Sequence, residues 1–330
     1  MSDMTLAILG SAGQLGRDLA ARAPAGTILL TRSDIDLSRP ETIRPALEGH
    51  RPTVLVNCAA YNFVDKAEAE PDAAFAINAW GVRALAQACG TLGIRLVHFS
   101  TDYVFGLDEG NGTPWPESAA PGPVSAYGIS KLAGEYAVRT FAPQHLVIRT
   151  CGLYGAWGSG GKGTNFIETM LRLAGQGKSL RVVNDQHCTP TSASDLADAT
   201  LKLIELGTNG LVHATNAGAT TWHDLAKEVF RSNGIAADLT PIISAEFGAP
   251  AKRPPYSVLS IARLNSLGID MPHWTDAVAK YLNERTPRLE SSKSAPHYSG
   301  TSPPHPSKPA VSPSSPRVGE VGERSEPGGG

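Results

Sequence analysis

The stretch TLAILGSAGQLGRDLA, residues 5–20, decides the fold of this 330-residue chain. An apolar run of strand length leads into Gly10, Gly13 and Gly16, and a helical pattern begins at Gln14. A glycine-rich turn between a strand and a helix lets the backbone approach a pyrophosphate, which the free N–H groups of the helix N-terminus can then bind. The alternative is a tight turn that binds no ligand. Because the turn follows the first strand of an alternating series, we expect it to bind a dinucleotide.

The alternation of strands and helices continues after this turn. Strand-length apolar runs occupy residues 5–9, 27–30, 53–56, 96–99 and 145–148, and helical patterns occupy 14–23, 40–47, 71–92 and 127–140. The apolar runs hardly alternate, which is typical of strands covered on both faces. The order predicts an α/β fold, a Rossmann-type doubly wound parallel sheet with right-handed crossovers.

After residue 150 the pattern loosens. Helical patterns at 165–174, 192–206, 222–232 and 275–283 mix with short strands at 180–183 and 211–214, which indicates a smaller interwoven C-terminal substrate domain. We therefore assign residues 1–151 to a dinucleotide-binding domain, to which 187–215 return, and residues 152–186 and 216–285 to the substrate-binding part. Residues 286–330 read as a disordered tail, because nine Pro, ten Ser and six Gly after residue 286 leave little to bury.

Composition excludes several classes of protein. A formal net charge of −2 provides no basic field for nucleic acid. No apolar run reaches the roughly 18 residues that span a bilayer, and no basic segment precedes the first apolar run as in a signal peptide. Four scattered cysteines without a CxxC pair favour buried free thiols over a disulfide or zinc framework. We expect a soluble, cytoplasmic protein.

The end of the second strand bears on the choice of coenzyme. An acidic residue there would bind the adenine ribose and select NAD, but this chain reads Thr31-Arg32-Ser33. Arg32 is placed to meet a 2′-phosphate, which favours NADP. The alternative is a solvated surface arginine.

Tyr127 and Lys131 form the only YxxxK in the chain and share one face of a predicted helix. A lysine ammonium there favours the tyrosinate and lowers the phenol pKa from about 10, so the phenol can exchange a proton with a carbonyl near pH 7. Thr101 follows the fourth strand, at the sheet edge where ligands bind, and its hydroxyl can share charge that develops on a substrate oxygen. The alternative is a surface helix with a packed Tyr and a solvated Lys.

Five motifs together resemble the extended short-chain dehydrogenase/reductases: GSAGQLG (10–16), NCAAYNFVDKAE (57–68), STDYVF (100–105), YGISKLAGE (127–135) and NFIETMLRLA (165–174). Within them the chain is most similar to the dTDP-4-dehydrorhamnose reductase family, through VVNDQHCTPTSASDLA (182–197), TTWHDLA (220–226) and weakly Lys252-Arg253-Pro254. The resemblance covers nearly all of residues 4–285. It implies a monomeric or homodimeric oxidoreductase that converts dTDP-4-dehydro-L-rhamnose to dTDP-L-rhamnose with NADPH, NADH being the alternative.

The resemblance also implies roles for individual residues. Tyr127 would give the proton while the nicotinamide gives hydride to the sugar C4 carbonyl, Lys131 would lower the Tyr pKa and hold the ribose, and Thr101 would orient the carbonyl. Coenzyme contacts would come from Gly10, Gly13, Gln14, Leu15, Gly16, Arg32, Asp36, Leu37, Ala60, Tyr61, Asn62 and Phe99, with Tyr127 and Lys131. Substrate contacts would come from Thr101, Asp102, Gly152, Asn165 and Arg253.

The chain departs from the family pattern at three places. Gly152 stands where members often carry an aromatic residue that packs on the substrate, which puts the identity or tightness of sugar binding in question. Thr31-Arg32 replaces the acidic end of the second strand seen in NADH-tolerant members. Some members bind magnesium through carboxylates at a dimer contact; Asp18 matches this only in part, and we assign no metal.

Two other functions remain open at this stage. A nucleotide-sugar epimerase or another ketosugar reductase of the same family would keep Thr101, Tyr127 and Lys131. The epimerase would hold NAD through several turnovers. A non-catalytic NADP-binding regulatory subunit would not need all three residues. The isolated His98, His187 and His223 are expected to be ordinary packed or surface histidines rather than metal ligands.

Overall fold

The computed structural model describes residues 4–108, 112–157 and 165–293, with side chains to Arg285. The strands are β1 Leu6–Leu9, β2 Ile28–Leu30, β3 Val54–Asn57, β4 Arg95–Thr101, β5 His145–Thr150, β6 Leu153–Tyr154, β7 Leu180–Val183, β8 His187–Cys188, β9 Thr191–Ser192, β10 Gly210–His213, β11 Thr220–Thr221 and β12 Leu239–Ile242. The helices are α1 Gln14–Ala20, η1 Pro40–Thr42, α2 Ile43–His50, α3 Val64–Ala69, α4 Pro71–Phe75, η2 Ala76–Gly81, α5 Val82–Leu92, η3 Asp102–Val104, α6 Ala126–Phe141, α7 Phe166–Gly175, α8 Ala193–Glu205, α9 Trp222–Ser232, α10 Ser244–Phe247, α11 Ala262–Ser266 and α12 Trp274–Lys293.

Six strands form one parallel sheet in the order β10-β5-β4-β3-β1-β2. The predicted doubly wound parallel fold is confirmed, and all five strands predicted in the first half lie in this sheet. The strand order reverses at β1, which has β2 on one side and β3 on the other. In open α/β sheets ligands bind beyond the carboxyl ends of the strands at such a switch point. The glycine turn after β1 lies there.

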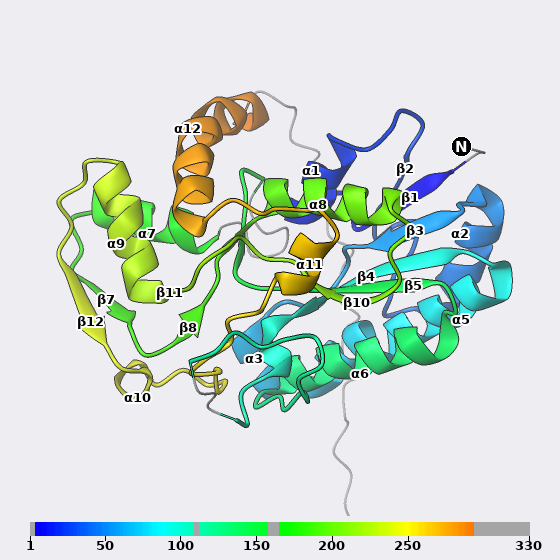
Figure 1. Ribbon diagram of the computed structural model, residues 1–330, viewed down its shortest axis with the longest axis horizontal. Coiled ribbons are helices and arrows are strands. Elements are labelled where there is room, and N and C mark those ends of the chain that lie inside the picture. The colour runs from blue at the N-terminus through cyan, green and yellow to red at the C-terminus, as the bar shows by residue number, and fades with distance from the viewer. Residues whose placement is uncertain (1–3, 109–111, 158–164, 294–330) are drawn as a thin grey trace, which may run out of the picture. The chain divides into compact units, whose positions relative to one another are not determined.

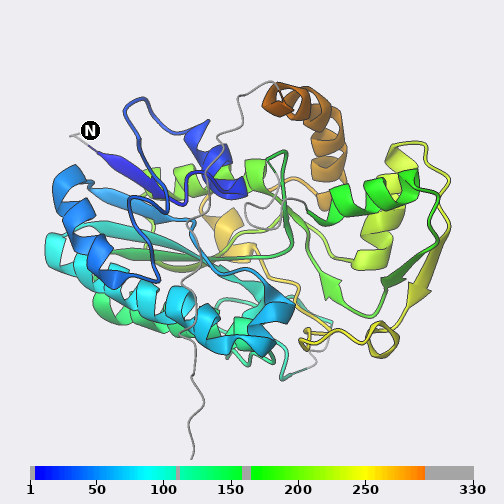
Figure 2. The ribbon, with the colours of Figure 1, turned by 180° about the vertical axis from the view of Figure 1, so that it is seen from behind.

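Helices cover both faces of this sheet (Figures 1 and 2). One face packs against α1 and α8 through Leu19, Leu196 and Leu203, all fully buried. The other face packs against α2, α5 and α6, with Leu85 and Val138 in the core. Burying each such side chain contributes roughly 1.5–3 kcal/mol. Because each strand is apolar toward both helical layers, its sequence shows little alternation.

The later part of the chain has a core of its own. Helices α7, α9 and α12 pack around Ile167, Val229 and Val278. Beside them lie short two-stranded pairings: β12 with β7 and β6 with β9 are parallel, and β11 with β8 is antiparallel. Helix α8 and strand β10, although late in sequence, lie with the large sheet.

The structure differs from the sequence-based expectations at two helices. Residues 71–92, expected as one helix, form α4, the π-helical η2 and α5. A Cβ on Gly81 would lie 2.2 Å from the Leu37 carbonyl oxygen, so this glycine lets the helix approach the loop after β2. Helix α12 runs to Lys293, beyond the expected end of the folded part near Arg285. The remainder of the predicted tail, 294–330, lies outside the described residues.

Within the described ranges no helix is both long enough and apolar enough to cross a membrane.

Candidate active site

The turn after β1 has no room for side chains at two glycines. A Cβ on Gly16 would lie 2.2 Å from the Gly10 carbonyl oxygen, and one on Gly10, whose φ is +78°, would lie 2.8 Å from the Ala59 nitrogen. Beside the turn, the Gln14 Oε1 atom is buried and has no hydrogen-bond partner among the described residues. A turn without side chains at Gly10 and Gly16, at a switch point of the sheet, fits the close approach of a dinucleotide pyrophosphate.

Arg32 lies past the end of β2 with its side chain 77% exposed. Its Nε donates to Asp36 Oδ2 at 3.0 Å, and Asp36 Oδ1 also accepts from the nitrogen and hydroxyl of Ser38. Burial raises the pKa of Asp36, but the bonds from Ser38 and Arg32 outweigh it and hold the pKa below its ordinary value. The next residue, Leu37, is buried. Asp36 thus restrains Arg32 at the surface.

The segment after β3 is held by a residue that the sequence did not single out. Asn78, fully buried in η2, accepts from the Tyr61 nitrogen at 2.9 Å and donates to the Tyr61 oxygen at 3.0 Å. The same Asn78 Nδ2 donates to Ser130 Oγ at 3.0 Å. Of the predicted coenzyme residues here, Tyr61 is buried, Ala60 half-buried and Asn62 exposed. A single asparagine inside a helical pattern gives no signal of this role.

The structure brings Thr101, Tyr127 and Asp102 together. Thr101 ends β4, Tyr127 lies in the first turn of α6, and a hydrogen bond joins their side chains. Helix α6 begins there because Ser125 caps it, its Oγ accepting from the Gly128 nitrogen. The ring of Tyr103 meets that of Tyr127 edge-on, with centroids 5.8 Å apart.

Lys131 lies one turn further along α6 and is buried. Its Nζ donates to the Phe99 carbonyl oxygen at 2.6 Å. Burial lowers the pKa of Lys131 to about 8, and the nearby Glu135 carboxylate opposes this shift. The predicted coenzyme residues Phe99 and Lys131 are therefore in contact.

The expected lowering of the Tyr127 pKa by Lys131 is not present in this arrangement. Burial raises the pKa of the phenol above its ordinary value, and only its interaction with the Thr101 side chain lowers it. The reason is that the ammonium is bonded to the Phe99 carbonyl while the phenol is enclosed by protein. A phenol with a raised pKa stays protonated through neutral pH.

Asp102 is buried and accepts three hydrogen bonds. The donors are Ser257 Oγ at 2.6 Å, Cys151 Sγ at 3.0 Å and Thr101 Oγ1 at 3.1 Å. Burial raises the pKa of Asp102, and these donors lower it in part. All four cysteines are free thiols, as expected. Asp102 thus joins β4 to β5 and to the segment before α11.

A buried ion pair ties helix α6 to β5. Arg149 donates from Nε and Nη2 to the two carboxylate oxygens of Glu135 at 2.8 and 2.7 Å. Glu135 follows Tyr127 and Lys131 at the same four-residue spacing, a signal that the sequence reading did not use. Nearby, His98 Nδ1 lies 3.1 Å from Asn57 Nδ2, and burial together with the Lys131 charge holds the His98 pKa well below its ordinary value.

The remaining predicted substrate residues are engaged by other parts of the chain. Gly152 has φ +51°, and a Cβ there would lie 3.4 Å from Trp222 Cη2 and 3.3 Å from Pro190 Cα. Asn165 caps α7 and donates to the Gly155 oxygen and the Tyr281 hydroxyl. Arg253 is paired with Asp65. Contacts of all three with a substrate stay predictions.

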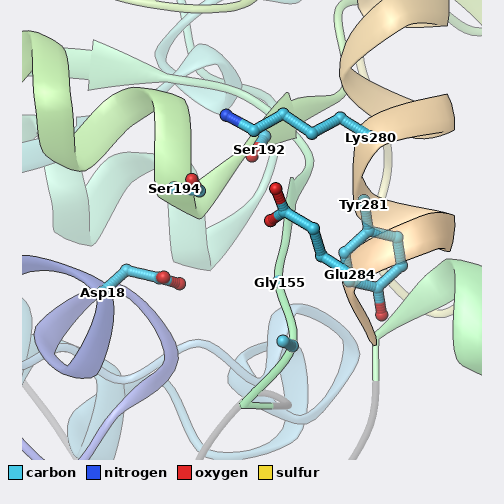
Figure 3. Close-up of a pocket in the computed structure, with 8 residues that line it drawn as sticks. Asp18, Gly155, Ser192, Ser194, Lys280, Tyr281 and Glu284 are labelled. Carbon is cyan, nitrogen blue, oxygen red and sulfur yellow. The ribbon is translucent and has the colours of Figure 1, made fainter. Parts of the chain in front are cut away.

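A magnesium ion does not fit the residues around Asp18. Figure 3 shows Asp18 of α1 and Glu284 of α12 directed toward a small cavity, about 10 Å³, that Ser194 and Lys280 also line. Asp18 is already paired with Arg22 at 3.1 Å, and Lys280 is paired with Asp195 at 3.3 Å. Mg²⁺ requires about six oxygen ligands, whereas the Asp18 carboxylate is engaged by Arg22 and the Lys280 ammonium that lines the cavity would repel a cation. No metal-binding group of three or more His, Cys, Asp or Glu occurs in the described part of the chain.

Comparisons with known proteins agree with this geometry. The family model described as the RmlD substrate binding domain matches residues 4–286. The chain is 39% identical over 300 residues to the dTDP-4-dehydrorhamnose reductase of Escherichia coli (strain K12), covering 85% of this chain and 98% of the relative. It is 41% identical over 287 residues to the enzyme of the same name from Streptomyces griseus, covering 83% and 91%.

Solved structures agree as well. A dTDP-4-dehydrorhamnose reductase from Bacillus anthracis in complex with NADP is similar with a TM-score of 0.79 and 34% identity, over 86% of this chain and 99% of that chain. A UDP-glucose 4-epimerase of Thermus thermophilus in complex with NAD has a TM-score of 0.71 but 19% identity, over 86% and 99%. The second likeness shows the shared fold only.

Proposed function

The chain belongs to the RmlD substrate binding domain family, and from this we propose that it reduces dTDP-4-dehydro-L-rhamnose to dTDP-L-rhamnose with NADPH, using Tyr127 as the proton donor. It is an oxidoreductase of the dTDP-4-dehydrorhamnose reductase type. The observation that carries the proposal is the hydrogen-bonded pair of Thr101 and Tyr127, buried at the carboxyl end of β4 beside Lys131.

The bare turn at Gly10 and Gly16 would hold the coenzyme pyrophosphate, with Gly13, Gln14 and Leu15 opening the helix beneath it. Tyr61 and Phe99 would lie along the coenzyme, and Lys131 would hold the nicotinamide ribose. The coenzyme supplies the hydride that C4 of the sugar receives. Arg32, beyond β2, would meet the 2′-phosphate that distinguishes NADPH from NADH.

Residues of the protein would supply the proton that the substrate oxygen receives. The substrate carbonyl oxygen would accept a hydrogen bond from Tyr127 Oη, and it gains negative charge as C4 is reduced. The Thr101 hydroxyl, which donates to Asp102 Oδ1 in this structure, would turn to donate to the same oxygen. The phenol proton then passes to this oxygen, because an alkoxide is a stronger base than a phenolate. Because its pKa is raised, Tyr127 stays protonated until negative charge develops on the substrate oxygen. The Lys131 ammonium, bonded to the Phe99 carbonyl, does not lower the Tyr127 pKa in this structure, so its proposed role is to hold the nicotinamide ribose.

Purified protein mixed with NADPH and dTDP-4-dehydro-L-rhamnose tests this function. The proposal predicts loss of nicotinamide absorbance and one dTDP-L-rhamnose formed for each NADPH consumed. Conversion of a nucleotide sugar without net NADPH consumption, together with tightly copurifying NAD, would show an epimerase instead. Coenzyme binding without turnover of a 4-keto sugar would point to the regulatory module.

A further inference from the structure

One carboxylate joins the segment before α11 to the segment after β3. Asp65, on α3, accepts from Arg253 Nη2 at 2.9 Å through Oδ2. Through Oδ1 it accepts from the Ala251 nitrogen at 3.3 Å, and Arg253 Nη1 donates to the Ala251 oxygen at 3.0 Å. The two partners are 188 residues apart in sequence. Asp65 therefore fixes both the backbone around residue 251 and the direction of the Arg253 side chain.

The Arg253 guanidinium lies beside the catalytic cluster. Its charge acts on the Tyr103 phenol, whose ring meets the Tyr127 ring edge-on. The Arg253 side chain is 17% exposed and that of Asp65 45%. Burial lowers the Arg253 pKa, but the bond to Asp65 and the charge interaction with Tyr103 outweigh it and keep the guanidinium charged. A fixed positive charge thus lies one aromatic ring away from the proton donor.

A guanidinium carries five N–H donors in a planar fork that suits phosphate oxygens. Asp65 and Ala251 engage part of this fork and fix its plane. We propose that Asp65 is a positioning residue: it holds Arg253 so that the remaining donors meet the diphosphate of the nucleotide sugar. This proposal rests on the proposed function and assigns to Asp65 a role in substrate affinity, not in the transfer of hydride or proton.

The proposal predicts a specific pattern of kinetic constants. Asp65→Asn keeps the shape of the side chain and removes its charge. It should raise KM for the dTDP-sugar and the Kd of dTDP, measured by calorimetry, by about two- to fivefold, the range expected for a half-exposed ion pair. It should leave kcat and the KM for NADPH unchanged. A matched control is Glu70→Gln, which breaks the exposed Lys66–Glu70 pair at the end of the same helix and should alter none of these constants.

A double-mutant cycle shows whether Asp65 acts through Arg253. Arg253→Met should weaken dTDP binding, and adding Asp65→Asn in that background should have no further effect. Equal effects of Asp65→Asn with and without Arg253 would overturn the proposal, as would an unchanged Kd in either single variant. Calorimetry of dTDP requires no turnover, so the result is independent of the reaction. A wild-type protein that does not bind dTDP contradicts the proposed function instead.

Discussion

Asn78 Nδ2 lies 3.0 Å from Ser130 Oγ, and this hydrogen bond joins the segment after β3 to helix α6. Ser130 Oγ in turn donates to the Tyr127 carbonyl oxygen at 2.7 Å. Because Asn78 also holds both backbone polar groups of Tyr61, one buried amide sets the spacing between the expected coenzyme segment and the proposed proton donor.

Asn78→Ala should therefore lower activity more than an ordinary core substitution. It leaves the Tyr61 nitrogen and oxygen buried without partners, at a cost of about 1–3 kcal/mol in the free energy of unfolding for each group. We expect kcat to fall at least tenfold while the protein stays folded at 25 °C. Asn233→Ala, which removes a bond from Asn233 Nδ2 to the Val229 oxygen at the end of α9, is the control and should leave kcat unchanged. Equal kcat values in the two variants would contradict a positioning role for Asn78.

Arg32→Asp should reverse the preference for coenzyme. The change places a negative charge where the 2′-phosphate of NADPH is expected, next to Asp36. We expect the ratio of kcat/KM for NADPH over NADH to fall about tenfold. This is near the low end of the effect of a charge-assisted hydrogen bond, because Arg32 is mostly exposed. Arg39→Asp is the control, since its exposed side chain pairs with Glu41 on the same loop. If the wild type prefers NADH, or if the ratio does not move in Arg32→Asp, then Arg32 is a solvated surface residue.

The pH dependence of kcat/KM for the sugar should follow the protonation state of Lys131. Its pKa of about 8 means that the ammonium is lost as pH rises through 8, so kcat/KM for the sugar should fall about tenfold per pH unit above that value. Tyr127, with a raised pKa, remains protonated there. Unfolding does not explain the loss: between pH 8 and 10.5 the unfolded state binds more protons at Lys131, so this group's contribution to the free energy of unfolding rises with pH. Activity that stays constant to pH 10 would contradict this assignment.

Removal of divalent metal should change neither activity nor thermal stability. The carboxylates of Asp18 and Asp195 are neutralised by Arg22 and Lys280, cations of the chain itself. Activity and Tm are measured after exhaustive treatment with EDTA and again after addition of magnesium. A fall in either quantity that magnesium restores would show that the junction of α1, α8 and α12 binds the metal after all.

Features encoded by local sequence were predictable. The apolar runs at 5–9 and 145–148 identified their strands because both faces of the sheet are covered. The spacing of Tyr127 and Lys131 placed both on one helix, and the end of β4 placed Thr101 beside Tyr127.

Features made by long-range contacts were not predictable. The π-helix that carries Asn78 packs through Gly81 against Leu37, and the Asp65–Arg253 pair joins residues 188 positions apart. The raised Tyr127 pKa was not predicted either. The spacing of the two residues indicates the nearby lysine, but it does not indicate the burial of the phenol or the Phe99 carbonyl that binds the ammonium.

Isotope transfer tests the central claim most directly. NADPH carrying deuterium at both hydrogens of nicotinamide C4 is mixed with dTDP-4-dehydro-L-rhamnose, and the product is analysed by NMR and mass spectrometry. The account predicts one deuterium at C4 of dTDP-L-rhamnose, and a rate at least a hundredfold lower with Tyr127→Phe, which still binds NADPH but lacks the proton donor. Deuterium absent from C4, or a Tyr127→Phe variant with near wild-type kcat, would contradict it.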